Sequence, residues 1–203
     1  MSREPAIGQE PLTSDEDLQR TRVCPLVPHN GPIALAEYDP DWPTMYARQA
    51  DRIRATLASL AIQVEHVGST SVPGLAAKPI IDIMLAVPDS ADEAAYVPAL
   101  AAAGYVLQNR EPDWFEHRLL KGPDADINLH VFSAGASEID RMVLFRDWLR
   151  SHDADRDAYL NVKRELANRT WRHVQHYADA KTSVVQQVLT RATAASNELD
   201  SAR

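Results

Sequence analysis

Residues 65–87, EHVGSTSVPGLAAKPIIDIMLAV, constrain the fold of this chain more than any other stretch. An alternating run ends at Gly68-Ser69, a loop rich in serine, proline and glycine follows, and a nearly all-apolar run closes the stretch. This pattern predicts a strand, a loop and then a central strand buried on both faces. The apolar run carries one carboxylate, Asp82. Because an unpaired buried carboxylate is costly, Asp82 is expected to be paired, to bind a metal or to face a cleft.

Hydrophobic periodicity predicts the remaining elements. The strands expected beside 79–87 are 62–67, 105–108, 115–120 and 127–132, and Gly122-Pro123-Asp124 is a turn signal. The expected helices are 43–60, 90–103 closing at Gly104, 137 to the break at His152-Asp153, 154–167 and 171–194. The pattern is an α+β, or mixed α/β, arrangement: a small mixed β-sheet flanked by helices, with a helical C-terminal third.

The chain of 203 residues is 45% hydrophobic, which suits one globular domain. Residues 1–32 are rich in proline, serine and acidic side chains, so they are predicted to form a mobile N-terminal arm. The folded domain is expected at residues 33–195, and residues 196–203 are expected to be a C-terminal tail.

Charge and cysteine content exclude several classes of function. A net charge of −8 disfavours general nucleic-acid binding, because such proteins need a basic face. The single cysteine, Cys24, excludes an intramolecular disulfide and multi-cysteine zinc sites. No apolar run approaches membrane-spanning length, and the N-terminus lacks a secretory pattern, so we expect a cytoplasmic protein with no membrane partner. The oligomeric state stays open.

Gly68-Ser69 is a candidate anion site. Backbone N–H groups and a hydroxyl at the end of a strand can face an anion, although the same pair is common in ordinary tight turns. Lys78 lies four residues before Asp82 and can neutralise it, contact a phosphate, or do both.

A Gly-Ser pair, a loop of about a dozen residues and a strand aspartate are similar to the signature of nucleotidyltransferase-fold enzymes. The chain more closely resembles the GrpB family, a branch with this fold. The resemblance covers residues 34–190 and is carried by YDPDWP (38–43), the stretch 65–87, GY (104–105), LHVF (129–132), FRDWLRSH (145–152), YLNVKRELA (159–167) and YADAK (177–181).

The resemblance implies a nucleotidyltransferase-like fold that binds a nucleoside triphosphate, a divalent metal and a small acceptor. Phosphate contacts are then expected from the turn, from Lys78 and from helical cations, namely Gly68, Ser69, Thr70, Ser71, Lys78, Arg146, Lys163 and Lys181. Asp82 is the expected ligand of Mg²⁺ or Mn²⁺. Such enzymes carry a second acid two positions later, where this chain has Met84, which cannot bind Mg²⁺.

Other residues are candidates to replace the missing acid. Glu65 precedes the Gly-Ser pair, and His66 beside it reads equally as a hydrogen-bonded core histidine. In 127–132, alternation puts Asn128 and His130 on one face with Asp126, so His130 is a candidate catalytic residue and metal ligand, although a solvated sheet face explains the pattern as well. His117 with His130 and Asp82 suggests a Zn²⁺ site instead.

Three functions stay open on these residues. The first is transfer of a nucleotidyl group to a small acceptor through Gly68-Ser69, Asp82 and His130. The second is a nucleotide- or phosphate-binding module without chemistry, which Met84 favours. The third is a metal-dependent enzyme whose His and Asp residues act on a small molecule. Arg110 and Arg118 are alternative phosphate clamps.

Overall fold

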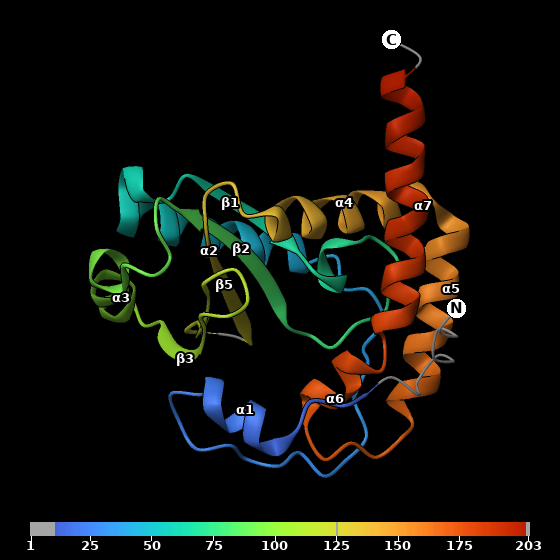
Figure 1. Cartoon of the computed structure of the whole chain (residues 1–203), viewed down its shortest axis with the longest axis horizontal. Helices are drawn as coiled ribbons and strands as arrows, with labels where there is room; N and C mark the ends of the chain where they lie inside the picture. The colour runs from blue at the N-terminus through green and yellow to red at the C-terminus, as the bar shows by residue number, and fades with distance from the viewer. Residues whose placement is uncertain (1–10, 125, 202–203) are drawn as a thin grey trace.

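The computed structural model describes residues 11–124 and 126–201 and shows a mixed sheet with helices on both sides (Figure 1). The strands are β1 (Gln63–Val67), β2 (Ile81–Val87), β3 (Val106–Glu111), β4 (His117–Lys121) and β5 (Ile127–Ser133). The helices are α1 (Asp15–Thr21), α2 (Trp42–Leu57), α3 (Glu93–Ala102), α4 (Ser137–Ser151), α5 (Asp153–Ala167), α6 (Val174–Asp179) and α7 (Thr182–Ser201).

The sheet has the order β1-β2-β5-β4-β3, in which β2 and β5 are parallel and the other neighbours are antiparallel. In the β2–β5 register, Asp82 pairs with Asn128 and Met84 with His130. Paired residues project to the same face, so these four side chains share one side of the sheet. The predicted mixed α+β architecture is confirmed.

One face of the sheet is covered by α2 and α3. The odd-numbered residues of β2 and β5 point to it and form the main core with both helices: Ile81, Ile83, Leu85, Val87, Ile127, Leu129 and Val131 with Ile53, Leu57, Tyr96 and Leu100. Burying an aliphatic side chain of this size contributes about 1.5–3 kcal/mol, so the alternation of β5 fixes which face becomes core.

The opposite face is covered only in part, by α4. Met84, Ala86 and Phe132 pack there against Ile139 of α4. Helices α5 and α7 stand beside the sheet, where Tyr159, Val184 and Val188 pack against Val72 and Leu75 of the loop that joins β1 to β2. In Figure 1, α7 forms an upright column at the side of the sheet. Asp82, Asn128 and His130, which also lie on this face, line a cavity.

Two predicted boundaries differ from the structure. The single helix expected over 171–194 is wrong, because a turn at residues 180–181 separates α6 from α7. No glycine or proline marks that break. Ala180 is buried in a cluster with Tyr177 and Trp171, so packing decides the turn. At the other end, α7 runs through residue 195 to Ser201, so the expected tail begins inside a helix.

The described part of the predicted arm, residues 11–32, lies against the body of the protein. Its helix α1 crosses beneath the sheet towards α6 (Figure 1). The Val23 amide donates to the Gln108 carbonyl (2.9 Å), and Gly31 and Trp171 exchange backbone hydrogen bonds. The mobility of the arm stays a prediction, and residues 1–10 lie outside the described residues. Within the described part of the chain, no helix has the length and apolarity needed to cross a membrane.

Candidate functional site

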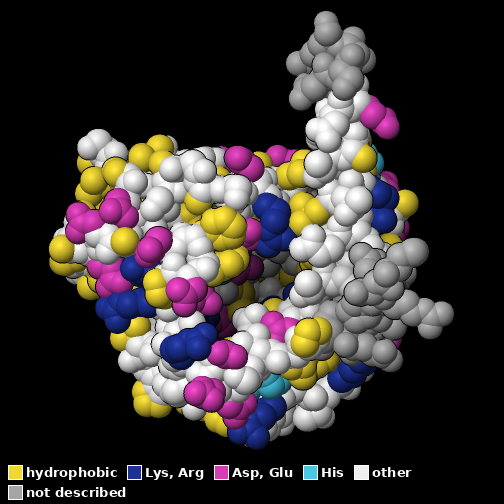
Figure 2. Space-filling model, viewed as in Figure 1, with side chains coloured by type: hydrophobic (Ala, Val, Ile, Leu, Met, Phe, Trp, Pro, Cys, Tyr) yellow, Lys and Arg dark blue, Asp and Glu magenta, His cyan; other side chains and the backbone are white. Residues whose placement is uncertain are grey.

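A cavity of about 630 Å³ lies between the sheet, the C-terminal helices and the arm. Figure 2 shows this face of the molecule hollowed between the sheet and α7. The cavity brings together the predicted Ser69, Asp82 and His130, which come from a loop and two strands. Its lining includes eight residues predicted as site residues: Gly68, Ser69, Thr70, Lys78, Asp82, His130, Lys163 and Lys181.

Asp82 is placed by a close approach of Gly68. Gly68 directly follows β1 with a φ of 68°, and a Cβ at this position would lie 2.3 Å from Asp82 Oδ2. The other carboxylate oxygen, Oδ1, accepts a hydrogen bond from Asn128 Nδ2 (2.8 Å), and Lys121 Nζ donates to Asn128 Oδ1 (2.8 Å). The lysine thus fixes which way the Asn128 amide faces. Asp82 remains 27% exposed, so the carboxylate can reach a ligand.

Asp82 is a carboxylate at neutral pH. Burial by itself raises its pKa, but the neighbouring His130, the hydrogen bond from Asn128 and the charge of Lys78 together lower it by more. The pKa of Asp82 therefore lies below its ordinary value. A central strand can therefore accommodate Asp82, because this residue lies at the cavity end of β2 and has Asn128 of β5 as its polar partner.

All four lysines of the chain line this cavity: Lys78, Lys121, Lys163 and Lys181. Burial lowers the pKa of Lys78 and of Lys181 to about 8, and the charge of Lys181 lowers that of Lys78 further. The pKa of Lys163 is also lowered, by burial first and then by Lys181 and Lys78. Like charges at close range are unfavourable without an anion between them, so the chemistry of the cluster suits a negatively charged group.

Two tyrosines hold the lysine side chains. Lys181 Nζ lies 4.5 Å and Lys78 Nζ 5.9 Å from the centre of the Tyr177 ring, and Lys163 Nζ lies 5.3 Å from that of Tyr159. Lys163 Nζ also donates to the Ala76 carbonyl (2.5 Å). The rings favour the charged form of the ammonium groups.

A chain of side chains leads away from Asp82 through the sheet. His130 Nε2 lies 3.5 Å from Asp82 Oδ1, and His130 Nδ1 lies 3.1 Å from His117 Nε2. His117 Nδ1 in turn lies 2.6 Å from Glu111 Oε2. The expected neighbourhood of His117, His130 and Asp82 is thus present, while the partnership of Glu111 was not foreseen.

Three predicted ligand or phosphate-binding residues lie outside the cavity lining. Glu65 and Arg146 bind each other instead (2.7 Å), because Arg146 reaches from α4 to β1 and also donates to the His66 carbonyl. Ser71 is buried, and its Oγ donates to the Gly68 carbonyl (2.6 Å), so it holds the turn rather than facing the cavity.

The remaining candidates are also accounted for by structural contacts. Arg110 and Arg118 both bind Glu93 of α3, at 2.7 and 2.6 Å, on the face opposite His130, so they do not act as clamps in this cavity. His66 is the core histidine of the alternative interpretation: it stacks on Tyr46 and bonds Thr70 Oγ1 (3.1 Å). Asp126 precedes β5 and is exposed.

The donor set does not fit a resident metal held by protein alone. Met84 is fully buried in the apolar cluster with Val67 and Phe132, so no second acid stands beside Asp82. Among residues 11–124 and 126–201, no group of three or more His, Cys, Asp or Glu is placed to hold a metal ion. Asp82 fits the different role of a single carboxylate ligand to Mg²⁺ that arrives with phosphate oxygens.

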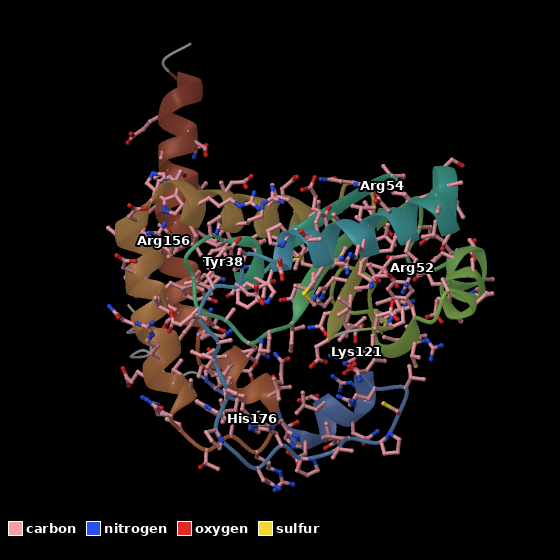
Figure 3. The ribbon with its side chains drawn as sticks, turned by 180° about the vertical axis from the view of Figure 1, so that it is seen from behind. Tyr38, Arg52, Arg54, Lys121, Arg156 and His176 are labelled. Carbon is pink, nitrogen blue, oxygen red and sulfur yellow. The ribbon has the colours of Figure 1, made fainter. Side chains whose placement is uncertain are left out.

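Sequence reasoning missed the contribution of Lys121, Tyr159 and the arm. Leu18, Arg22, Leu26, Val27 and His29 of the arm line one wall of the cavity. Seen from behind, Lys121 and His176 lie on either side of α1 (Figure 3), and His176 Nε2 is 3.0 Å from the Thr13 carbonyl. A signal for Lys121 existed, since this chain has few lysines. No signal placed the arm.

Comparison with known proteins gives one consistent family. Residues 32–191 match the family described as GrpB protein. UPF0157 protein BH1888 of Halalkalibacterium halodurans is 65% identical over 181 residues, covering 89% of this chain and 93% of that protein. The crystal structure of GrpB from Enterococcus faecalis superposes with a TM-score of 0.65 at 28% identity, covering 78% of this chain and 96% of that one.

A more distant relative is a longer protein. A protein of Mycobacterium bovis named dephospho-CoA kinase is 30% identical in an alignment of 201 positions that covers 81% of this chain. The match covers 49% of that protein, so its name describes a chain about twice as long.

Proposed function

This chain belongs to the GrpB family, and from that premise we propose that its cavity binds a nucleoside triphosphate and transfers the nucleotidyl group to a small acceptor. The observation that carries the proposal is the convergence of the Gly68-Ser69 turn, Asp82, His130 and four lysines on one cavity. Membership of this chain in the nucleotidyltransferase-like superfamily is part of the same proposal.

The lysines support a polyphosphate as the ligand. Within a chain of net charge −8, the cavity is lined by four ammonium groups and the carboxylate of Asp82. A triphosphate supplies the negative charge that this cluster lacks, and phosphoryl transfer depends mainly on positioning and charge neutralisation. The Gly68-Ser69 turn adds backbone N–H groups and a hydroxyl beside Asp82.

The proposed reaction is an in-line displacement at the α-phosphorus. The acceptor oxygen forms a bond to that phosphorus, the bond to the bridging oxygen of pyrophosphate breaks, and pyrophosphate leaves with the electron pair. The acceptor proton goes to His130, which lies beside Asp82. A divalent cation entering with the nucleotide would be held by Asp82 and phosphate oxygens, and would supply further charge neutralisation.

A second candidate is a nucleotide- or phosphate-binding module that performs no transfer. The burial of Met84 where related enzymes have a second acid favours it. Both candidates predict binding of a polyphosphate, and they differ in whether a divalent metal is needed.

Isothermal titration calorimetry with ATP, GTP, CTP, UTP and inorganic tripolyphosphate tests the proposal, each with and without Mg²⁺ or Mn²⁺. Nucleotide binding that requires the metal, and that Asp82→Asn abolishes, supports transfer. Metal-independent binding that Asp82→Asn leaves unchanged supports the binding module. Lys181→Met is expected to weaken either kind at least about tenfold, whereas Arg48→Met, which removes a charge from the exposed face of α2, is the control. Absence of binding by every nucleotide and by tripolyphosphate would refute both.

A further inference from the structure

Four neighbouring strands each contribute one side chain to a continuous polar chain that crosses the sheet. Asp82 of β2 lies in the cavity, His130 of β5 and His117 of β4 follow, and Glu111 of β3 ends the chain. His117 is 3% exposed, whereas Glu111 is 30% exposed and reaches solvent. Both histidines are held firmly: their rings stack on each other at 5.2 Å between centroids, and Phe132 stacks on His117 at 4.7 Å.

The three distances determine where the protons lie when both histidines are neutral. The 2.6 Å contact between His117 Nδ1 and Glu111 Oε2 requires a proton between the two atoms, since a nitrogen lone pair facing a carboxylate at that distance is strongly repulsive. A neutral imidazole has one N–H, so His117 Nε2 carries a lone pair and accepts.

Because His117 Nε2 accepts a hydrogen bond, it determines the tautomer of His130. The 3.1 Å contact needs a donor, so His130 carries its proton on Nδ1 and has a lone pair on Nε2. That lone pair faces Asp82 Oδ1 at 3.5 Å, a distance that does not require a proton between them. With both protons on the other ring nitrogens, a lone pair of His117 would face Glu111 at 2.6 Å, where the repulsion is stronger.

We propose that Glu111 and His117 are positioning residues that hold His130 with Nδ1 protonated, so that its Nε2 acts as the general base for the acceptor hydroxyl. This rests on the proposed function. In the step, the acceptor O–H bond breaks, its proton goes to His130 Nε2, and the electron pair of that bond forms the new bond to phosphorus. Asp82 stabilises the imidazolium that results, and His130 Nδ1–H keeps its bond to His117 throughout.

The arrangement also defines what the acceptor must offer. A lone pair beside a carboxylate rejects an anionic atom and favours a group that brings a proton, such as an alcohol or amine. The acceptor class is therefore a neutral hydroxyl or a protonated amine rather than a carboxylate or phosphate.

The tautomer of His130 can be read directly in the full-length protein from the ¹⁵N chemical shifts of labelled histidine side chains at pH 8. The seven histidines are assigned by single substitutions. Protonated Nδ1 and unprotonated Nε2 are expected for His130 in the free protein. The opposite tautomer would overturn the proposal, whatever the protein binds.

Glu111→Lys provides a reversal, because an ammonium group only donates and must place the lone pair of His117 on Nδ1. The chain then flips, and His130 is expected to carry its proton on Nε2. Asp113→Lys, the same charge change at an exposed residue two positions away, is the matched control and leaves the tautomer unchanged. Glu111→Gln can still accept and is expected to preserve it. If Glu111→Lys shows the parent tautomer, Glu111 does not position His130.

Catalytic consequences are separable from nucleotide binding. Glu111→Lys is expected to bind ATP within about threefold of the parent and to lose at least about a hundredfold in transfer rate, as general-base loss does. Failure of ATP to bind the parent would sink the proposed function while leaving the tautomer result standing. A parent-like transfer rate in a flipped variant would refute the role of Nε2.

Discussion

Gly68 combines a left-handed backbone conformation with a close approach to the Asp82 carboxylate. Its φ of 68° suits glycine, and there is no room for a side chain between its Cα and Asp82. Gly74 in the same loop has a similar φ of 78°, yet no atom lies within 4 Å of where its Cβ would be. The two glycines therefore separate backbone strain from crowding of Asp82.

Gly74→Ala is expected to cost about 1–2 kcal/mol of unfolding free energy from its positive φ alone. Gly68→Ala also carries the cost of a positive φ and must in addition displace Asp82, so we expect a further loss of about 1–3 kcal/mol and loss of nucleotide binding. Urea unfolding and calorimetry measure both quantities. Equal losses in the two variants would show that contact with Asp82 does not constrain position 68.

His66 gives the fold a pH dependence of known sign. Burial lowers its pKa from 6.5 to about 4, against the opposing charge of Asp82. Between these values the unfolded chain binds more protons than the folded one, so stability rises with pH and is lost as pH falls below about 6.5. The full loss is roughly 3 kcal/mol and is reached at pH values below 4.

His66→Phe keeps the stacking on Tyr46 but cannot be protonated. We expect the parent to lose about 2 kcal/mol more than this variant between pH 7 and pH 5, because only the parent pays for a buried imidazolium. Urea unfolding at both pH values provides the comparison. Parallel losses in the two proteins would mean that His66 protonates freely in the fold.

Among the elements, the arm is held to the body by polar contacts. Helix α1 has no buried residue, Asp15 binds Arg172 and His173, and the Thr13 amide donates to Asp179 (2.8 Å). Exposed ion pairs of this kind contribute about 0–1 kcal/mol each, so we expect the arm to open locally without unfolding of the sheet.

Asp15→Asn is expected to speed tryptic cleavage within the arm, at Arg20 or Arg22, by about fivefold while the body stays intact, because it weakens the contact between α1 and residues 172–173. Asp17→Asn is the matched control, since Asp17 contacts Ser14 and Arg20 within the same segment. Mass spectrometry of the fragments measures the rates. Equal rates for the two variants would show that Asp15 does not fasten the arm.

On the scale of the whole molecule, the lysines are concentrated at one place. The chain has 21 lysines and arginines, and its four lysines all line the cavity. An amine-specific reagent therefore reports on the cavity, together with the amino terminus. Two of these lysines have a pKa of about 8, so they are more nucleophilic at that pH than ordinary lysines.

Acetylation at pH 8 is expected to modify Lys78 and Lys181 first among the lysines, apart from the amino terminus, because Lys163 is only 2% exposed. Tripolyphosphate is expected to slow their modification at least about fivefold, because phosphate oxygens raise the pKa of the amines and shield them. Sodium chloride at the same ionic strength is the control. Protection by sodium chloride equal to that by tripolyphosphate would show screening rather than binding.

Local pattern predicted much of the fold and part of the site. The two-residue period of 127–132 placed Asn128 and His130 on one face and the core residues on the other, since burial of either face excludes a one-residue slip. The turn at Gly68-Ser69 and the strand aspartate were also visible, because both depend on neighbours within 20 residues.

Contacts between distant segments were decided only in the tertiary structure. Three features depend on such contacts: the pairing of Arg146 with Glu65, the break between α6 and α7, and the position of the arm against the cavity. Whether a cation faces a ligand or a neighbouring acid depends on which partner the packing brings within about 3 Å, and periodicity carries no such information. The sequence determined strands, faces and the signature turn, whereas packing selected which charges meet in the cavity.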